Sequence, residues 1–422
     1  MQTQESPAPD ITRLAVPIAI IFFMWGFGTG ALWVARPLFA LALGGTLLQV
    51  GLVSALSATP RPIFGPVTGL LCDRWGRRPL LILAAIGHGG ILVAQFASTS
   101  YLHFVLLEGL AGISIAIWTI SSSVLIADIT KIASRGRAVA FRDTAMRLGM
   151  LAGPIVGGVI AAQFEWRWVF IFIASTKVVA IYIVLFFIPE TKPASVPLGA
   201  TGRPGAIRAS GAGIPWAMFR TRSFVAIAAA TVCFGMIGLG PGLFRTYYPV
   251  HAQETLMLAP DVIGNLVAMG AVLTLLTAAP VGFAVDRFGR KWPLVLGLVL
   301  LGAAVYLLGM SAAFIGVAAA FAVFAIAEGM NSNTMQTYAM DLAPAAQRGV
   351  FLSAFHVATS SGMIAGPLLA GLLAERVGLE TTLIIFTGVV ASCVLLFAVL
   401  AQETLQRGQR QDSPASHTGF PS

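Results

Sequence analysis

The chain has 422 residues, of which 57% are hydrophobic and only 10% are charged, and its mean hydropathy is +0.86. Soluble domains carry about 25% charged residues, so this composition excludes a soluble globular protein and predicts an integral membrane protein. The first ten residues are polar, and no small-residue cleavage site follows the first apolar run. That run is therefore expected to be a retained membrane span rather than a signal peptide.

Apolar runs follow one another along the chain, and each is long enough to cross a bilayer, which takes about 20 residues. The predicted spans are 14–40, 46–71, 79–99, 102–127, 138–163, 166–189, 223–249, 260–285, 292–312, 314–340, 346–374 and 378–401. The sequence therefore predicts an all-α integral membrane fold with twelve transmembrane helices.

Polar segments divide these spans into two sets of six. The segment between the sets is rich in proline, glycine and alanine and is too polar to cross the membrane, so it is expected to be a linker. The predicted divisions are an N-terminal segment 1–13, a bundle 14–189, a linker 190–222, a bundle 223–401 and a tail 402–422.

The distribution of basic residues predicts the orientation. Most of the 26 lysines and arginines lie in segments that share a side with the N-terminus, whereas the opposite loops keep few, chiefly Arg167, Arg245 and Arg376. The positive-inside rule then places both termini and the linker in the cytoplasm. The anionic inner leaflet also accounts for the net charge of +9 without a nucleic-acid partner.

Two segments of the chain recur at a constant step. Gly69–Arg78 recurs almost unchanged as Gly282–Lys291, and Gly149–Gly158 recurs as Gly362–Gly371, both after 213 residues. One six-helix unit is therefore written twice, and internal repeats of this kind are how many membrane transporters are built.

The repeated G-x-x-x-D-R-x-G-R-R/K loop, with twelve spans and a basic linker, resembles the major facilitator superfamily over residues 14–401. The resemblance implies two pseudo-symmetric six-helix bundles around a cavity that opens alternately to each side, with spans 1, 4, 7 and 10 along the path. The partners expected are a small-molecule substrate, protons and the lipid bilayer of a bacterial plasma membrane. A monomer that is neither an enzyme nor a holder of cofactor or metal is expected.

The two copies of the loop are predicted to gate the cytoplasmic face. Gly69 and Gly282 are expected to allow close helix approach, and the loop carboxylates to meet an arginine or a helix N-terminus. The alternative is that these residues only anchor the topology. The predicted gating residues are Gly69, Asp73, Arg74, Gly76, Arg77, Arg78, Gly282, Asp286, Arg287, Gly289, Arg290 and Lys291.

The second repeated segment has a flat face of small residues and a proline that removes one helix hydrogen bond. It resembles the motif associated with the antiporters of the superfamily and so favours export, although simple helix packing is the alternative. The residues are Gly149, Gly153, Pro154, Gly157, Gly158, Gly362, Gly366, Pro367 and Gly371.

Charged residues inside the spans are functional candidates because a charge is costly there. Glu108 and Glu328 are predicted to bind protons, since a carboxyl group shielded from water takes up a proton more readily. Members of the superfamily tend to carry an arginine about twenty residues before the residue that matches Asp128, where this chain has Glu108. The alternative is a static ion pair with Arg61 or Arg36.

Other intramembrane charges have simpler explanations. Asp143 and Arg147 are four residues apart, so an intrahelical ion pair is expected. Lys177 is expected to reach the interface or pair with another helix.

The most specific function predicted is proton-coupled export, by antiport, of a drug-like compound or metabolite. The first alternative is symport or exchange of an anionic metabolite, with Arg36, Arg61, Arg147 and Lys177 supplying the counter-charge. An alternative of another class is a membrane sensor or scaffold that transports nothing.

Overall fold

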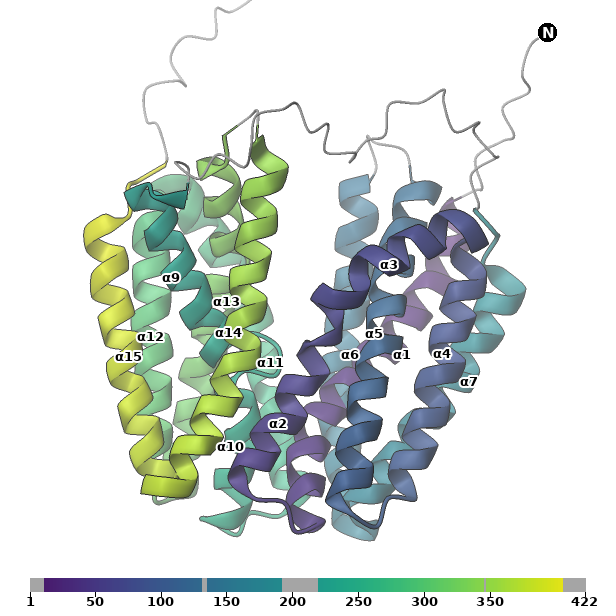
Figure 1. The fold of residues 1–422 in the computed structure, drawn as a ribbon, viewed down its shortest axis with the longest axis horizontal. Helices are drawn as coiled ribbons and strands as arrows, with labels where there is room; N and C mark the ends of the chain where they lie inside the picture. Colours follow the sequence, from purple (N-terminus) through teal and green to yellow (C-terminus); the bar gives the residue numbers. More distant parts are fainter. Residues whose placement is uncertain (1–10, 131–134, 192–218, 345–346, 405–422) are drawn as a thin grey trace, which may run out of the picture.

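The structure is a computed structural model that describes residues 11–130, 135–191, 219–344 and 347–404 (Figure 1). Within these ranges the side chains of residues 11–13, 61, 135–137, 278, 279, 286 and 288 are outside the description. The described ranges hold these helices: α1 (Ile11–Ala42), α2 (Leu47–Ala58), α3 (Pro60–Trp75), α4 (Arg77–Phe96), α5 (Tyr101–Ile129), α6 (Arg135–Phe164), α7 (Trp166–Phe187), α9 (Arg222–Ile237), α10 (Leu243–Glu254), α11 (Pro260–Phe288), α12 (Lys291–Gly309), α13 (Phe314–Leu342), α14 (Arg348–Val377) and α15 (Leu379–Leu400).

Among the described residues, ten helices are long and apolar enough to cross a membrane. The pairs α2–α3 and α9–α10 each make one further crossing with an interruption, which is consistent with the twelve predicted spans. Pro60 begins α3 and lacks an N–H group, so the helical hydrogen bonds of the span are interrupted there. The run Gly238–Gly242 separates α9 from α10, with Gly240 at φ 57°. The all-α membrane fold is confirmed, but these two spans are not continuous helices.

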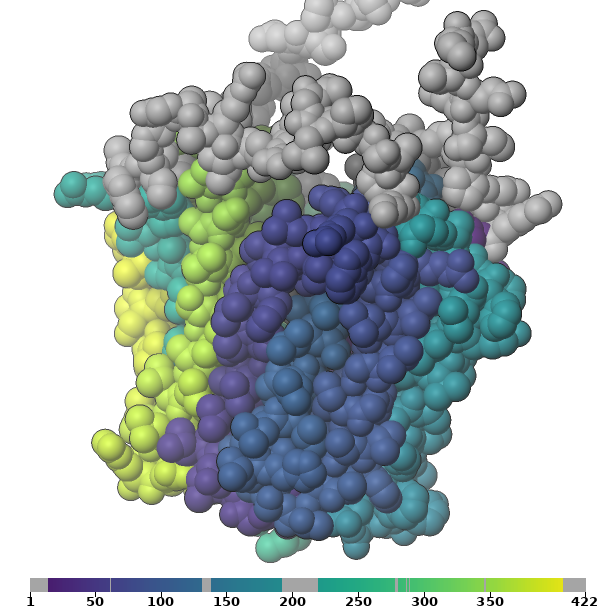
Figure 2. Space-filling view, turned by 45° about the vertical axis from the view of Figure 1, so that its right-hand side comes forward, coloured from purple at the N-terminus to yellow at the C-terminus, as the bar shows by residue number. Residues whose placement is uncertain are grey.

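The helices form an N-terminal bundle (α1–α7) and a C-terminal bundle (α9–α15), which lie side by side in Figure 1. The bundles touch where α2 packs on α14 and α6 packs on α11. Figure 2 shows the side chains of α2 and α14 meeting along this seam.

Hydrogen bonds between the bundles join residues at one end of the molecule, where α1 ends and α2 begins. Thr246 donates to Ser54 over 2.9 Å, and the Leu48 N–H donates to Glu375 over 3.1 Å. The Tyr247 hydroxyl lies 2.9 Å from the carbonyl oxygen of Leu47. We call this end, where the bundles are bonded together, the closed end.

The glycine motif of α6 packs against two different helices. A Cβ atom on Gly149 or Gly153 would lie 2.0 or 2.1 Å from carbonyl oxygens of α1, which belongs to the same bundle. A Cβ atom on Gly158 would lie 2.6 Å from the Pro260 carbonyl oxygen of α11, which belongs to the other bundle. No side chain fits at these distances, so the motif sets both the internal packing of the N-terminal bundle and its contact with its partner.

The copy of the motif in α14 repeats this division. Gly362 and Gly366 face α9 of their own bundle, where a Cβ atom would lie 2.2 Å from the carbonyl oxygens of Val232 and Met236. Gly371 faces the other bundle, where a Cβ atom would lie 2.6 Å from the Leu47 carbonyl oxygen of α2. The last glycine of each copy therefore lies in the seam between the bundles.

Candidate functional site

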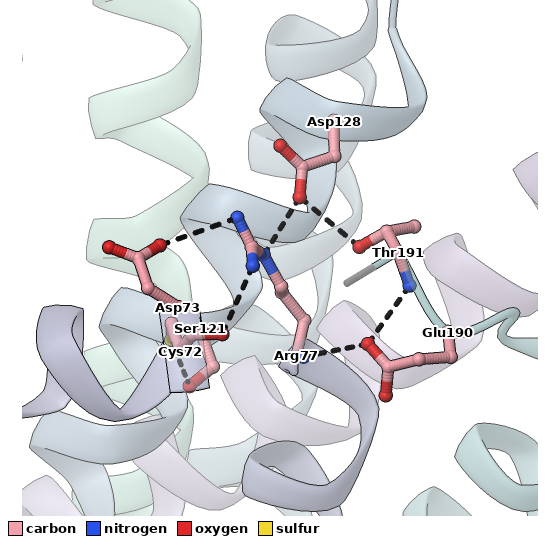
Figure 3. Close-up of polar contacts among 7 residues, drawn as sticks. All are labelled: Cys72, Asp73, Arg77, Ser121, Asp128, Glu190 and Thr191. Carbon is pink, nitrogen blue, oxygen red and sulfur yellow. Dashed lines mark hydrogen bonds and ion pairs between the residues drawn. The ribbon is translucent and has the colours of Figure 1, made fainter. Parts of the chain in front are cut away.

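A cluster of charges joins three helices of the N-terminal bundle at the end opposite the closed end (Figure 3). The Arg77 guanidinium at the start of α4 lies 2.8 Å from Asp128 at the end of α5. It also lies 3.8 Å from Asp73 at the end of α3 and donates to the Cys72 carbonyl oxygen over 3.0 Å. Arg77 is buried whereas the Asp73 side chain is 73% exposed, so Asp128 is the closer and better shielded partner.

The residues that follow α7 complete this cluster, as Figure 3 shows. The Glu190 carboxylate accepts the backbone N–H groups of Arg77 and Thr191, each over 3.0 Å. The Thr191 hydroxyl donates to Asp128 over 3.2 Å. Gly76 has φ 93°, and a Cβ atom there would lie 2.4 Å from Glu190, so only glycine fits the turn. Glu190 thus caps the N-terminus of α4 with a negative charge, the sign that the helix dipole favours.

The C-terminal bundle repeats the arginine, aspartate, glutamate and threonine contacts of this cluster. Arg290 forms an ion pair with Asp341, and Glu403 accepts the N–H groups of Arg290 and Lys291 over 2.9 and 3.1 Å. The Thr404 hydroxyl donates to Asp341 over 3.1 Å. Glu403 follows Glu190 by the same 213 residues that relate the loops. These Glu-Thr pairs were not among the residues predicted from the sequence, although the constant step of 213 residues relates them.

Other predicted loop residues have different surroundings from those expected. A Cβ atom on Gly69 or Gly282 would meet none of the described atoms within 4 Å, so the expected close helix approach is absent at these two positions among the described residues. The physical reason is that the bundles are bonded together at the opposite end.

The basic residues of the loops contact groups near their own helices. Arg78 donates to the Leu185 carbonyl oxygen, and the Arg287 guanidinium lies 6.0 Å from the centre of the Phe283 ring. Lys291 lies over Trp292 at 5.5 Å, and Arg74 is exposed. The side chain of Asp286 lies outside the described residues.

Glu108 is fully buried inside the N-terminal bundle. Its carboxylate lies 3.0 Å from the Arg36 guanidinium of α1 and accepts a hydrogen bond from Gln95 of α4 over 2.9 Å. The geometry is that of the static pair with Arg36. The side chain of Arg61, the other predicted partner, lies outside the description.

Glu328 of α13 is paired with Arg245 of α10, whose guanidinium lies 2.5 and 2.6 Å from the two carboxylate oxygens. Arg36, one of the two partners considered for Glu328, pairs with Glu108 instead, and the expectation that Arg245 lies in an outer loop was wrong. The interruption at Gly238–Gly242 begins a new helix that carries Arg245 into the bundle, where its side chain is 10% exposed.

This pair lines a pocket between the two bundles. The Arg245 guanidinium also lies 3.9 Å from the centre of the Trp33 ring of α1, a cation–π contact between the bundles. The pocket volume is about 60 Å³, enough to hold water. Its lining is Trp33, Arg147, Met150, Arg245, Val267, Gly270, Ala271, Thr274, Leu275, Phe321, Phe324, Ala325 and Glu328.

Arg147 lies in the wall of this pocket without the predicted partner. The carboxylate of Asp143 lies 2.8 Å from the guanidinium of its neighbour Arg142, which takes the place of the expected intrahelical pair with Arg147. Among the side chains that the structure describes, Arg147 forms no ion pair. The pocket wall therefore holds two guanidinium groups and one carboxylate.

Lys177 of α7 is buried and does not reach the interface, but it does contact another helix, α1, through an aromatic ring. Its side chain is 2% exposed, and its ammonium nitrogen lies 4.1 Å from the centre of the Trp25 ring. Trp25 in turn stacks on Trp118, with ring centres 4.1 Å apart. The aromatic face supplies the favourable electrostatic contact for this amine. Lys177 is not part of the pocket wall.

Comparison with known proteins agrees with this architecture. A profile described as Major Facilitator Superfamily matches residues 18–251 and 231–419. The chain is 25% identical to the class E tetracycline resistance protein of Escherichia coli over 304 residues, covering 70% of this chain and 72% of that protein. It is 24% identical to a Na⁺, Li⁺, K⁺/H⁺ antiporter of Planococcus maritimus, covering 84% of each chain.

Solved structures share the fold. A bacterial homologue of the human lysosomal transporter Spinster, in an inward-facing and occupied conformation, superposes with a TM-score of 0.74 at 15% identity. The match covers 94% of this chain and 97% of that one. With helices that fit a membrane, the duplicated loop and a family match over most of its length, the chain is a multi-pass membrane transporter that belongs to the Major Facilitator Superfamily.

Proposed function

We propose that this protein exports a small organic solute in exchange for protons and that Glu328 binds the coupled proton. The observation that carries the proposal is the Glu328–Arg245 ion pair in the wall of the pocket between the bundles. The Glu328 side chain is 14% exposed, so a proton can reach it, whereas Glu108 is 0% exposed and paired inside one bundle.

Protonation of Glu328 would remove the charge that holds Arg245. Arg245 also stacks on Trp33 of the other bundle, so a change at Glu328 alters a contact between the bundles. A ligand shifts a conformational equilibrium only through different contacts in the two states. The Arg245–Trp33 contact supplies such a difference, since it spans the seam that must open in alternating access.

Two observations support export. The relatives include a tetracycline resistance protein and a cation/proton antiporter. The last glycine of the motif associated with antiporters lies in the seam in both copies. We place both termini and the Arg77 and Arg290 clusters on the cytoplasmic side, with 14–189 and 223–401 as the transport bundles and 190–222 as their linker. The closed end then faces outward, and entry of a solute into the narrow pocket requires movement of the bundles.

The second candidate is co-transport of an organic anion with a proton. Arg147 favours it, because this guanidinium lines the pocket with no acidic partner among the described side chains. A proton on Glu328 would free Arg245 as a second cation, and the anion and the proton would then strengthen each other's binding.

Transport in proteoliposomes with an imposed pH gradient separates the candidates. Solute movement opposite to the protons supports export by antiport, and movement with the protons supports the anion co-transporter. Glu328→Gln should abolish the response to the gradient, whereas Glu380→Gln, which alters an exposed carboxylate at the start of α15, should not. A Glu328→Gln protein that still responds like the wild type would refute the proton role of Glu328.

A further inference from the structure

A groove on the outer surface of the C-terminal bundle is separate from the transport pocket. It runs between α9 and α15 and has a volume of about 480 Å³. Helix α15 lies at the edge of the C-terminal bundle farthest from the N-terminal bundle in Figure 1, so the groove faces the surroundings of the protein. Its lining is apolar throughout: Phe219, Phe224, Val225, Ala228, Ala229, Val232, Cys233, Met236, Val389 and Cys393.

The groove follows α9 for most of that helix. Its lining on α9 extends from Phe224 to Met236, or about 18 Å at 1.5 Å per residue. The small side chains of Ala228 and Ala229 leave the space, because larger residues at these positions would fill it. A hydrocarbon chain is the occupant whose shape and polarity match a long apolar groove on a membrane-facing surface.

Two arginines lie at one end of this groove. Arg220 and Arg222 lie in the chain between Phe219 and Phe224, the residues that begin the groove wall. Consecutive Cα atoms are only about 3.8 Å apart, so the Cα atoms of both arginines lie within a few ångströms of the groove wall. Both are exposed, and among the described side chains neither forms an ion pair.

Neighbouring features increase the positive character of this end. The N-terminus of α9 begins at Arg222, where the helix dipole is positive and favours an anion. The segment from 190 to 222 contains one acidic residue, Glu190, whose carboxylate caps α4 in the other bundle. An acid in the adjoining sequence is therefore not available to neutralise the two arginines.

We infer that this groove binds an anionic phospholipid, with an acyl chain along α9 and the phosphate between Arg220 and Arg222. Basic pockets between membrane helices are suited to anionic headgroups, and the groove adds an apolar channel for the chain. The inference is independent of the direction of transport. Because α9 precedes α10, which carries Arg245, the lipid would contact the same interrupted span as the coupling pair.

Native mass spectrometry of the purified full-length protein tests the inference directly, without a transport measurement. Phosphatidylglycerol should bind at least about tenfold more tightly than phosphatidylcholine with the same acyl chains, and Arg220→Gln with Arg222→Gln should weaken its binding by about 25-fold, at roughly fivefold per arginine. Arg376→Gln removes one exposed arginine from the last turn of α14 and is the control for Arg222→Gln. It should change the affinity less than twofold.

Two further measurements test the chain and the headgroup separately. Ala229→Trp fills the groove and should weaken the binding of phosphatidylglycerol while both arginines remain, provided that its thermal unfolding midpoint matches the wild type. Glycerol phosphate, which has the headgroup charge but no acyl chain, should not displace the lipid. Equal affinity for the two lipids, an Arg376→Gln effect equal to that of Arg222→Gln, full binding by Ala229→Trp, or displacement by glycerol phosphate would each overturn the inference. If Ala229→Trp unfolds early, Ala228→Leu takes its place with the same expectation.

Discussion

The Glu328–Arg245 pair gives the most direct test of the proposed coupling site, because each partner can be replaced separately. Removing one member of a fully buried pair costs about 3 to 5 kcal/mol, since the other charge remains without a counter-ion. The two side chains are 14% and 10% exposed, so we expect the lower limit, about 3 kcal/mol, for Glu328→Gln. Arg245→Gln also loses the contact with Trp33, worth about 0.5 to 2 kcal/mol.

The double variant that combines Glu328→Gln with Arg245→Gln should be less destabilised than the two single variants together. Both positions would then carry neutral side chains, so no uncompensated charge remains, and a coupling energy of about 2 kcal/mol is expected for residues in direct contact. Thermal unfolding in detergent measures the difference, with a midpoint shift on the order of 5 °C for each single variant. Glu254→Gln, at the end of α10, is the matched control and should leave the midpoint unchanged. Strictly additive single effects would show that the pair does not interact in the protein, and the coupling argument would fail with it.

Three further experiments test separate parts of the architecture. Glu190→Ala removes the acceptor of two backbone N–H groups and should cost about 2 kcal/mol at about 1 kcal/mol per hydrogen bond; an unchanged unfolding midpoint would contradict the cap. Asp128→Asn should destabilise the protein by about 1 to 2 kcal/mol because Arg77 is buried against this carboxylate. Asp73→Asn should cost below about 0.5 kcal/mol, because the Asp73 carboxylate is exposed and farther from Arg77. The reverse order in thermal unfolding would refute the assignment of partners. Gly158→Leu should force the seam apart and raise thiol labelling of a cysteine placed at the closed end by about tenfold, since opening by about 1.4 kcal/mol is a factor of ten. Gly90→Leu, where a Cβ atom meets no described atom within 4 Å, should not change the labelling.

The helices and their duplication could be predicted from the sequence because they depend on local information. Apolar runs of about 20 residues predict crossings, and the repeat of 213 residues predicts two equivalent bundles. The same step also relates Glu190 to Glu403, so the capping carboxylates were within reach of the sequence. They were overlooked because they follow a span rather than belong to the repeated loop.

The charge partners could not be predicted because they depend on helix depth and on competition between neighbours. Arg245 was expected in an outer loop, near the end of the span 223–249, but the break after Gly238 starts a new helix that places it inside the bundle. The pairing of Asp143 was decided by Arg142, the adjacent residue, rather than by the residue one turn away. Arg36 was one of two possible partners named for Glu108, but the two residues are 72 positions apart, and no periodicity in the sequence chooses Arg36 over Arg61.

The two acidic candidates differ because the repeat does not extend to them. Both carboxylates lie on equivalent helices, α5 and α13, but the step of 213 relates Glu108 to Phe321 rather than to Glu328. Phe321 and Glu328 are seven residues apart, which is two turns or about 10 Å along the helix. The displacement leaves Glu108 sealed inside one bundle, while Glu328 lies in the pocket that both bundles line. A coupled proton must reach its carboxylate and must affect a contact that changes during transport. Of Glu108 and Glu328, only Glu328 meets both conditions. In the proposed function, the duplicated helices supply the motion, and the position of one unduplicated acid, Glu328, couples that motion to the proton.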